Sequence, residues 1–169
     1  VPATCHPLGK RNKLVIAPGA LTGTTAPNSG RLSIGCKSPL TGGIKESNAG
    51  GTPAYKLGRL GIDAIVLEGL QRGQEWHILH VSGEGARLIP GGEYQGLKNY
   101  ELVKLLQSRF GDKVGILSIG PVGEMKLSTA TVAATDTSGF PCRHAARGGP
   151  GAVMGSKGLK GIVIDDAGA

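Results

Sequence analysis

The sequence predicts a β-rich α+β domain, and three features indicate it: an aliphatic core, many glycine-rich loops and an internal duplication. Hydrophobic residues make up 39% of the 169 residues and aromatic residues only 4%, so the core must consist mainly of Val, Ile, Leu and Ala. Such a mixture favours strands or α/β layers. The length suits one domain, since single cores are common at about 100–200 residues.

Short apolar or alternating runs between Gly, Pro and Ser predict the strands. We expect strands at 13–17, 31–36, 62–68, 76–81, 86–89, 113–119, 126–134 and 161–165. The runs 76–81 and 86–89 flank Gly83-Glu84-Gly85 and therefore predict a hairpin.

Helices are expected at 51–60, 99–110 and about 150–157. The helix at 99–110 has the strongest pattern, because Leu102, Leu105, Leu106 and Phe110 share one face and Gly111 follows as a C-terminal cap. Pro53 fits the first turn of the helix at 51–60.

The sequence repeats itself in the order loop, helix, strand. Gly50-Gly51 precedes a helix and the strand GIDAIVLE (61–68), and Gly148-Gly149 precedes a helix and GLKGIVID (158–165). The offsets are 148 − 50 = 98 and 158 − 61 = 97. We interpret this as one domain over 1–169 with two pseudo-symmetric halves, roughly 1–90 and 91–169. Chance similarity between short α/β segments is the alternative.

Glycine-rich loops before helices point to an anionic ligand. The chain has 30 glycines, far above the usual share of about 7%. A helix that opens after Gly-Gly presents unpaired amides and a positive dipole, which bind phosphate or carboxylate. Two such loops would suit a ligand with two anionic arms. Neither loop matches the GxxxxGK[ST] or GxGxxG nucleotide motifs, while Arg31, Arg143 and Arg147 lie beside the loops.

The formal net charge of +7 also implies an anionic partner, with nucleic acid, a phosphate-bearing cofactor or an acidic protein as the candidates. Lys and Arg are dispersed and no nucleic-acid motif occurs, so we expect no nucleic-acid binding. No run approaches the roughly 20 apolar residues of a membrane span, so no membrane association is expected.

The three cysteines, Cys5, Cys36 and Cys142, predict neither a disulfide framework nor a metal site. They are odd in number and far apart, and we expect buried, structural thiols in a reducing cytoplasm. Asp165 and Asp166 are expected to be a charged pair in water at the end of a strand.

The motifs together resemble the aldehyde ferredoxin oxidoreductase family, specifically its amino-terminal domain. They occur in the family's order over nearly the whole chain: LTGTTAPNSGR (21–31), KSPLTGG (37–43), SNAGG (47–51), LGIDAIVLEG (60–69), SIGPVGE (118–124) and RGGPGAVMGSKGLKGI (147–162). The resemblance implies two β-sheets related by a pseudo-twofold axis, on which a tungsten or molybdenum bis-pterin rests.

The resemblance also implies the site residues. The cofactor-binding positions are Arg31, Asn48, Gly50, Arg143, His144 and Ala146. The backbone carbonyls of Asn48 and His144 would hold a magnesium ion that bridges the pterin phosphates. His144 stands where the family often has a small residue, and Ala146 stands where it commonly has glycine.

The implied function is that of a cofactor-binding domain or subunit of an enzyme that oxidises aldehydes to carboxylic acids. The chain is expected to be truncated relative to the family, with the [4Fe–4S] cluster only in the missing domains. Its partners would be those domains and ferredoxin, and a homo-oligomer is possible. The alternative is a non-catalytic, stand-alone module that binds a pterin, another phosphate-bearing ligand or a partner subunit.

Overall fold

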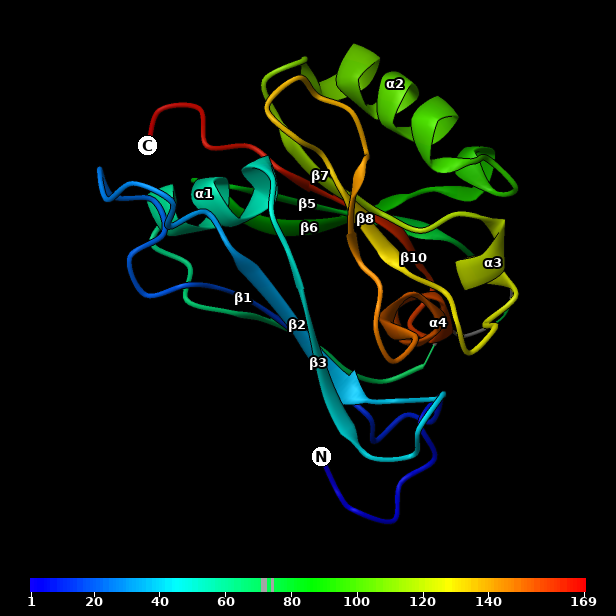
Figure 1. Ribbon diagram of the computed structural model, residues 1–169. Coiled ribbons are helices and arrows are strands. Elements are labelled where there is room, and N and C mark those ends of the chain that lie inside the picture. Colours follow the sequence, from blue (N-terminus) through cyan, green and yellow to red (C-terminus); the bar gives the residue numbers. More distant parts are fainter. Residues whose placement is uncertain (71–72, 74) are drawn as a thin grey trace.

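The computed structural model describes residues 1–70, 73 and 75–169, which form two β-sheets with short helices around them (Figure 1). The strands are β1 (Leu14–Pro18), β2 (Leu32–Lys37), β3 (Ile44–Ala49), β4 (Ile65–Leu67), β5 (His77–Ser82), β6 (Gly85–Pro90), β7 (Gly115–Ser118), β8 (Val132–Ala134), β9 (Arg143–Ala145) and β10 (Leu159–Ile164). The helices are α1 (Thr52–Arg59), α2 (Asn99–Phe110), α3 (Pro121–Glu124), α4 (Pro150–Ser156) and the 3-10 helix η1 (Gly92–Tyr94). The α+β class is therefore confirmed.

The smaller sheet has the strand order β3-β2-β1-β4 and is antiparallel throughout. The larger sheet has the order β6-β5-β10-β7-β8-β9, and its one parallel pair is β5 with β10. The order β9-β8-β7-β10 thus repeats β3-β2-β1-β4. In each set a helix, α1 or α4, precedes the last strand in sequence.

The register of the strands shows that the repeat is real at the level of single residues. Ser33 pairs with Asn48 across β2 and β3, and Ala133 pairs with His144 across β8 and β9. The pairs between the first and last strands of each set correspond in the same way: Ile16 with Ile65, and Leu117 with Ile162. Asn48 and His144 therefore occupy equivalent positions in the two sets of strands.

The segment between the two repeats extends only the larger sheet. The β5–β6 hairpin, confirmed as expected, joins the edge beside β10, although the predicted boundary near residue 90 assigned it to the first half. The helix α2 ends at Phe110, and the amide of the following Gly111 donates to the Gln107 carbonyl at 2.8 Å, as expected for a cap. It packs on the other face of the larger sheet through Leu102, Leu106 and their neighbours. Leu105, which was expected on the same face, is 47% exposed.

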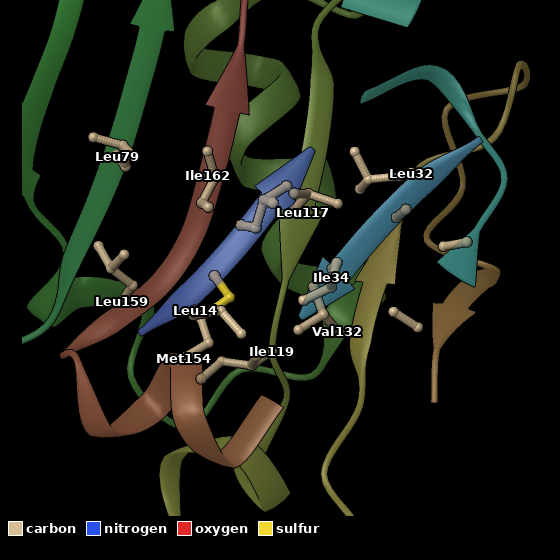
Figure 2. Packing of buried hydrophobic residues seen from close by; sticks show 14 of the residues in the cluster. Leu14, Leu32, Ile34, Leu79, Leu117, Ile119, Val132, Met154, Leu159 and Ile162 are labelled. Carbon is tan, nitrogen blue, oxygen red and sulfur yellow. The ribbon is translucent and has the colours of Figure 1, made fainter. Parts of the chain in front are cut away.

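The main core lies between the two sheets. Figure 2 shows side chains of the smaller sheet, such as Leu14 and Ile34, among Leu117, Val132 and Ile162 of the larger sheet. Met154 of α4 closes this core, which contains Trp76 as its aromatic side chain. Aliphatic packing of this kind agrees with the low aromatic content of the chain.

The sequence missed β3, β9, η1 and α3, and it predicted a strand over 126–134 of which only β8 exists. Lys126 has a φ of 57°, and the Ala130 amide bonds to the Leu127 carbonyl at 2.9 Å, so this part forms turns. The β3 strand is polar and β9 has three residues, so neither carries an apolar pattern.

Two charged residues of the C-terminal segment, Lys160 and Asp166, are buried. Asp166 is 9% exposed and lies between Lys56, at 2.5 Å, and Arg59, at 3.2 Å, so the expectation of a pair in water is wrong for this residue. Lys160 is fully buried and pairs with Glu124, and its ammonium also donates to the Leu97 carbonyl at 2.8 Å. Ion pairs explain why these charges tolerate burial.

Candidate functional site

The candidate site lies where the edge strands of the two sheets, β3 and β9, run next to each other. Two adjoining hollows open here. The first, of about 490 Å³, is lined by Arg31, Asn48, Ala49, Gly50, Gly51, Asp136, Thr137, Cys142, Arg143 and His144. The second, of about 450 Å³, is lined by Arg31, Lys45, Glu46, Ser47, Asn48, His144, Ala146 and Arg147.

All the residues that the sequence singled out as cofactor-binding line these hollows. Arg31, Asn48 and His144 border both of them and so form the wall between them. Gly50 and Arg143 border the first hollow only, and Ala146 borders the second only. The fold thus brings together residues from positions 31 to 146 of the chain.

Positive charge dominates the lining. The lining contains four basic residues, Arg31, Lys45, Arg143 and Arg147, and two acidic residues, Glu46 and Asp136. Guanidinium groups bind phosphate through paired hydrogen bonds, so the hollows suit an anionic ligand.

Both carboxylates are engaged by the protein itself. Glu46 accepts a hydrogen bond from the Ser33 hydroxyl at 2.5 Å and one from the Asn48 amide, and these bonds lower the pKa of Glu46. Asp136 accepts bonds from the Cys142 thiol at 3.1 Å and the Phe140 amide at 3.0 Å, which lower its pKa. Asp136 therefore organises the loop that leads to Arg143.

Each glycine loop is held by the other half of the molecule. The Thr52 amide, just after Gly51, donates to the Thr135 carbonyl at 2.8 Å. The Ser38 hydroxyl donates to the Gly148 carbonyl at 2.7 Å. Gly51, with a φ of 112°, leaves no room for a Cβ atom, which would overlap the Thr135 carbonyl oxygen. Contacts between the two halves therefore hold both loops in place.

The anion-binding role expected for the helix N-termini is not supported at two of their amides. The Thr52 amide at the start of α1 is bonded to Thr135, and the Gly151 amide at the start of α4 is bonded to the Ala130 carbonyl at 3.0 Å. A contact between the two halves occupies the Thr52 amide, and a contact within the second half occupies the Gly151 amide. Arginine side chains and the exposed loop backbone provide the lining instead.

The second half contributes a hydrogen-bonded pair at the wall between the hollows. Thr131 Oγ1 lies 2.9 Å from His144 Nδ1.

The backbone at Ala146 has no positive φ, since among the described residues only Asn28 and Lys126 combine a side chain with positive φ. Alanine therefore fits the backbone at this position without strain.

The sequence missed several lining residues, namely Lys45, Glu46, Ser47, Asp136 and Thr137. The Ser47 hydroxyl accepts the Arg147 amide at 3.0 Å and joins the two halves. The SNAGG motif (47–51) could have indicated Lys45, Glu46 and Ser47, because these residues directly precede or begin it and lie on the same edge strand, β3. Cys5 and Cys36 are buried and free as expected, but Cys142 is exposed, which corrects its expected burial.

Among the described residues, no group of three or more His, Cys, Asp and Glu side chains is placed to hold a metal ion. No helix in the described part of the chain is long and apolar enough to cross a membrane.

The fold and the site define a duplicated α+β domain with cationic, glycine-lined hollows at the junction of its halves. The chain belongs to the aldehyde ferredoxin oxidoreductase family: residues 1–166 match the model of the aldehyde ferredoxin oxidoreductase N-terminal domain. The resemblance noted in the sequence is thereby confirmed.

The names of similar proteins agree with this family assignment. The tungsten-containing aldehyde ferredoxin oxidoreductase of Pyrococcus furiosus is 41% identical over 163 residues, which cover 96% of this chain and 26% of that protein. The aliphatic sulfonate oxidoreductase, WOR-like subunit, of the same organism is 29% identical and is covered to 27%. These homologues are oxidoreductases. The chain spans about a quarter of the length of the curated relatives it matches.

A solved structure has the same fold. The active site complex BamBC of benzoyl coenzyme A reductase, in complex with 1,5 dienoyl-CoA, superposes with a TM-score of 0.89 and is 28% identical. The match covers 97% of this chain and 24% of that one. The two-sheet architecture is therefore shared with a much larger protein.

Proposed function

We propose that this chain holds a tungsten bis-pterin, with molybdenum as the alternative metal, in an enzyme that oxidises aldehydes to carboxylic acids. The observation that carries the proposal is the pair of cationic hollows with a common wall at equivalent residues of the two repeats, Asn48 and His144. A cofactor with two similar phosphate-bearing arms matches such a pair. Named relatives that contain tungsten support the choice of metal.

The residues present fit this group. Arg31 and Arg143 would bind phosphate oxygens, since their guanidinium groups border the first hollow. Gly50 would allow close approach of the ligand, because a Cβ atom there would have only the Arg31 guanidinium within 4 Å. Ala146, with its small side chain, would do so in the second hollow.

The wall between the hollows would hold a magnesium ion through the backbone carbonyls of Asn48 and His144. Magnesium prefers oxygen ligands and commonly combines few protein ligands with phosphate oxygens.

The bound cofactor supplies the two-electron chemistry, and this chain orients it. None of the side chains that line the hollows is assigned as a general acid or base. We propose that further domains carry the substrate pocket and a [4Fe–4S] cluster that passes electrons to ferredoxin. The three cysteines of this chain, two of them buried, cannot supply the four ligands of such a cluster.

That last observation favours a second candidate for the chain by itself, a stand-alone module that binds a pterin or another phosphate-bearing ligand. Elemental analysis of the protein purified anaerobically from its native host, with everything that co-purifies, separates the two. Stoichiometric tungsten or molybdenum with iron and a larger partner supports the enzyme. A metal-free chain that still binds phosphate esters supports the module.

The site assignment is tested by two arginine variants. Arg143→Ala removes a lining guanidinium, whereas Arg87→Ala removes one on β6, outside both hollows. We expect Arg143→Ala to lower retained tungsten or molybdenum clearly and Arg87→Ala to leave it unchanged. Equal metal content in the two variants would contradict the assignment.

A further inference from the structure

The two repeats differ in the residue that stands beside the wall of the hollows. Arg31 and Thr131 are equivalent, because each lies two residues before the strand residue that pairs with the wall residue: Ser33 with Asn48, and Ala133 with His144. The first half therefore offers a guanidinium at a position where the second half has a hydroxyl. The second arm of a two-armed anionic ligand would lack one donor.

The imidazole of His144 lies beside Thr131. The side chains of Val132 on β8 and Ala145 on β9 are fully buried in the core. Those of Thr131, just before β8, and His144, one position away on β9, therefore point to the other side. They are diagonal neighbours across the strand pair, which places their side chains within reach of each other. His144 is exposed and lines both hollows.

The hydrogen bond to Thr131 decides what the imidazole offers to a ligand. Thr131 Oγ1 lies 2.9 Å from Nδ1, while Nε2 has no hydrogen-bond partner among the described residues. A neutral imidazole has one nitrogen that donates and one that accepts. If the Thr131 hydroxyl donates to Nδ1, Nε2 must carry the hydrogen and donate it outward. An anion in a hollow that is otherwise rich in guanidinium groups favours this tautomer.

We propose that His144 Nε2–H is an anion-binding donor of the second repeat and that Thr131 is the positioning residue that fixes its tautomer. The inference rests on the proposed function, since it takes the ligand to be phosphate-bearing. It gives the His144 side chain a role separate from that of its backbone carbonyl. The pair acts as the counterpart of Arg31.

Two measurements on the purified 169-residue chain test the inference, with inorganic pyrophosphate as the probe. Long-range ¹H–¹⁵N spectra at about pH 8, where histidine side chains are ordinarily neutral, report the tautomer. His144→Ala identifies its signals among those of the four histidines. Titration calorimetry measures pyrophosphate affinity for Thr131→Val, Thr131→Ser and Thr129→Val, the last an exposed threonine that lines neither hollow.

We expect His144 to be protonated at Nε2, and Thr131→Val to weaken pyrophosphate binding about fivefold, the value of one ordinary hydrogen bond. Thr131→Ser and Thr129→Val should bind within about twofold of the wild type, and Thr131→Val should add nothing to His144→Ala. A hydrogen at Nδ1 in the wild type would overturn the inference even if Thr131→Val fails to fold. So would wild-type affinity in His144→Ala.

The outcomes separate this inference from the proposed function. Loss of pyrophosphate binding in Arg143→Ala with wild-type affinity in Thr131→Val would leave the proposed function standing and reject the role of Thr131. Wild-type affinity in both Arg31→Ala and Arg143→Ala, or no binding by the wild type, would count against both.

Discussion

The hydroxyl group of Ser38 donates a 2.7 Å hydrogen bond to the carbonyl oxygen of Gly148, 110 residues further along the chain. Ser38 is fully buried, and its oxygen also accepts the amides of Leu40 and Thr41 at 3.1 and 3.0 Å. One side chain thus shapes a turn of the first half and holds the glycine loop of the second. The two halves depend on each other for the geometry of the hollows.

Replacing Ser38 by alanine is expected to destabilise the fold by about 1–3 kcal/mol, because it leaves a buried carbonyl and two amides without this partner. Pyrophosphate binding should weaken as well, since the loop before Gly149 loses its anchor. Urea unfolding and calorimetry measure the two effects. Ser108→Ala, at an exposed hydroxyl bonded within α2, is the control and should cost less than about 0.5 kcal/mol. Equal costs for the two variants would contradict the role of Ser38.

A second prediction concerns close packing at Gly149. Gly149 and Gly61 have nearly the same φ, 73° and 69°, but a Cβ at Gly149 would overlap the Ser128 carbonyl oxygen, whereas at Gly61 it would meet nothing within 4 Å. Gly61→Ala should therefore cost about 1–2 kcal/mol for the backbone alone. Gly149→Ala should cost about 1–3 kcal/mol more, because the loop must move. Urea unfolding of both variants checks this. Equal midpoints would show that the loop around Gly149 moves without a cost in stability.

The sequence alone predicts the features that recur in both halves of the chain. It does not predict those that depend on contacts between the two halves. The offset between Gly50-Gly51 and Gly148-Gly149 predicts the duplication, and Asn48 and His144 have corresponding partners in the two sets of strands. The polar strand β3 carries no apolar alternation, since it lies at a sheet edge and turns Lys45 and Glu46 into a hollow. Its role is set by contact with β9, which is distant in sequence.

The same reason explains the buried charges. Nothing near Asp166 in the sequence shows that Lys56 and Arg59, about a hundred residues earlier, would lie against it. Nor does the pattern around Lys160 reveal Glu124 as its partner. A single sequence shows which residues are charged, but only the fold shows which of them are buried together as ion pairs.

A third prediction concerns this buried pair. The side chain of Lys160 is 0% exposed and that of Glu124 is 11% exposed. Lys160→Met should cost about 3–5 kcal/mol, because it leaves a carboxylate buried without its counter-ion. The double variant Lys160→Met with Glu124→Gln should recover a large part of this loss, since the Gln oxygen can still accept the Gly96 amide. Urea unfolding of the single and double variants measures the coupling.

The exposed pair of Lys13 and Glu68, at 3.1 Å, provides the control for that cycle. Lys13→Met should cost less than about 1 kcal/mol, because water screens the charges. If Lys160→Met costs as little as Lys13→Met, the buried pair does not stabilise the fold in the way that its burial indicates.

The last prediction is a pH dependence that arises at His80. This residue is 7% exposed, stacks on Phe110 with ring centroids 4.9 Å apart, and has no partner for Nδ1. Burial lowers the pKa of His80 below its ordinary value of 6.5, and the positive charge of Arg87 lowers it further, against Asp165 and Glu84, which raise it.

The sign of the effect follows from these contacts. Because the unfolded chain binds the proton more readily, the free energy of unfolding should fall as the pH drops below about 6.5, and the loss should end below the folded pKa. Arg109, whose guanidinium lies 5.3 Å from the centre of the Phe110 ring, places a second positive charge on that side. His80→Leu removes the titrating group and should flatten this part of the profile.

Urea midpoints between about pH 5 and pH 8, the range in which histidine ordinarily titrates, test this for the wild type, His80→Leu and His6→Gln. His6 is exposed, so its replacement should leave the profile unchanged. Carboxylates contribute to all three proteins alike at the acid end, and the difference between the wild type and His80→Leu isolates the histidine. If the two profiles run parallel over this range, protonation of His80 does not oppose folding, and the unpartnered Nδ1 must find a donor or a water molecule in solution.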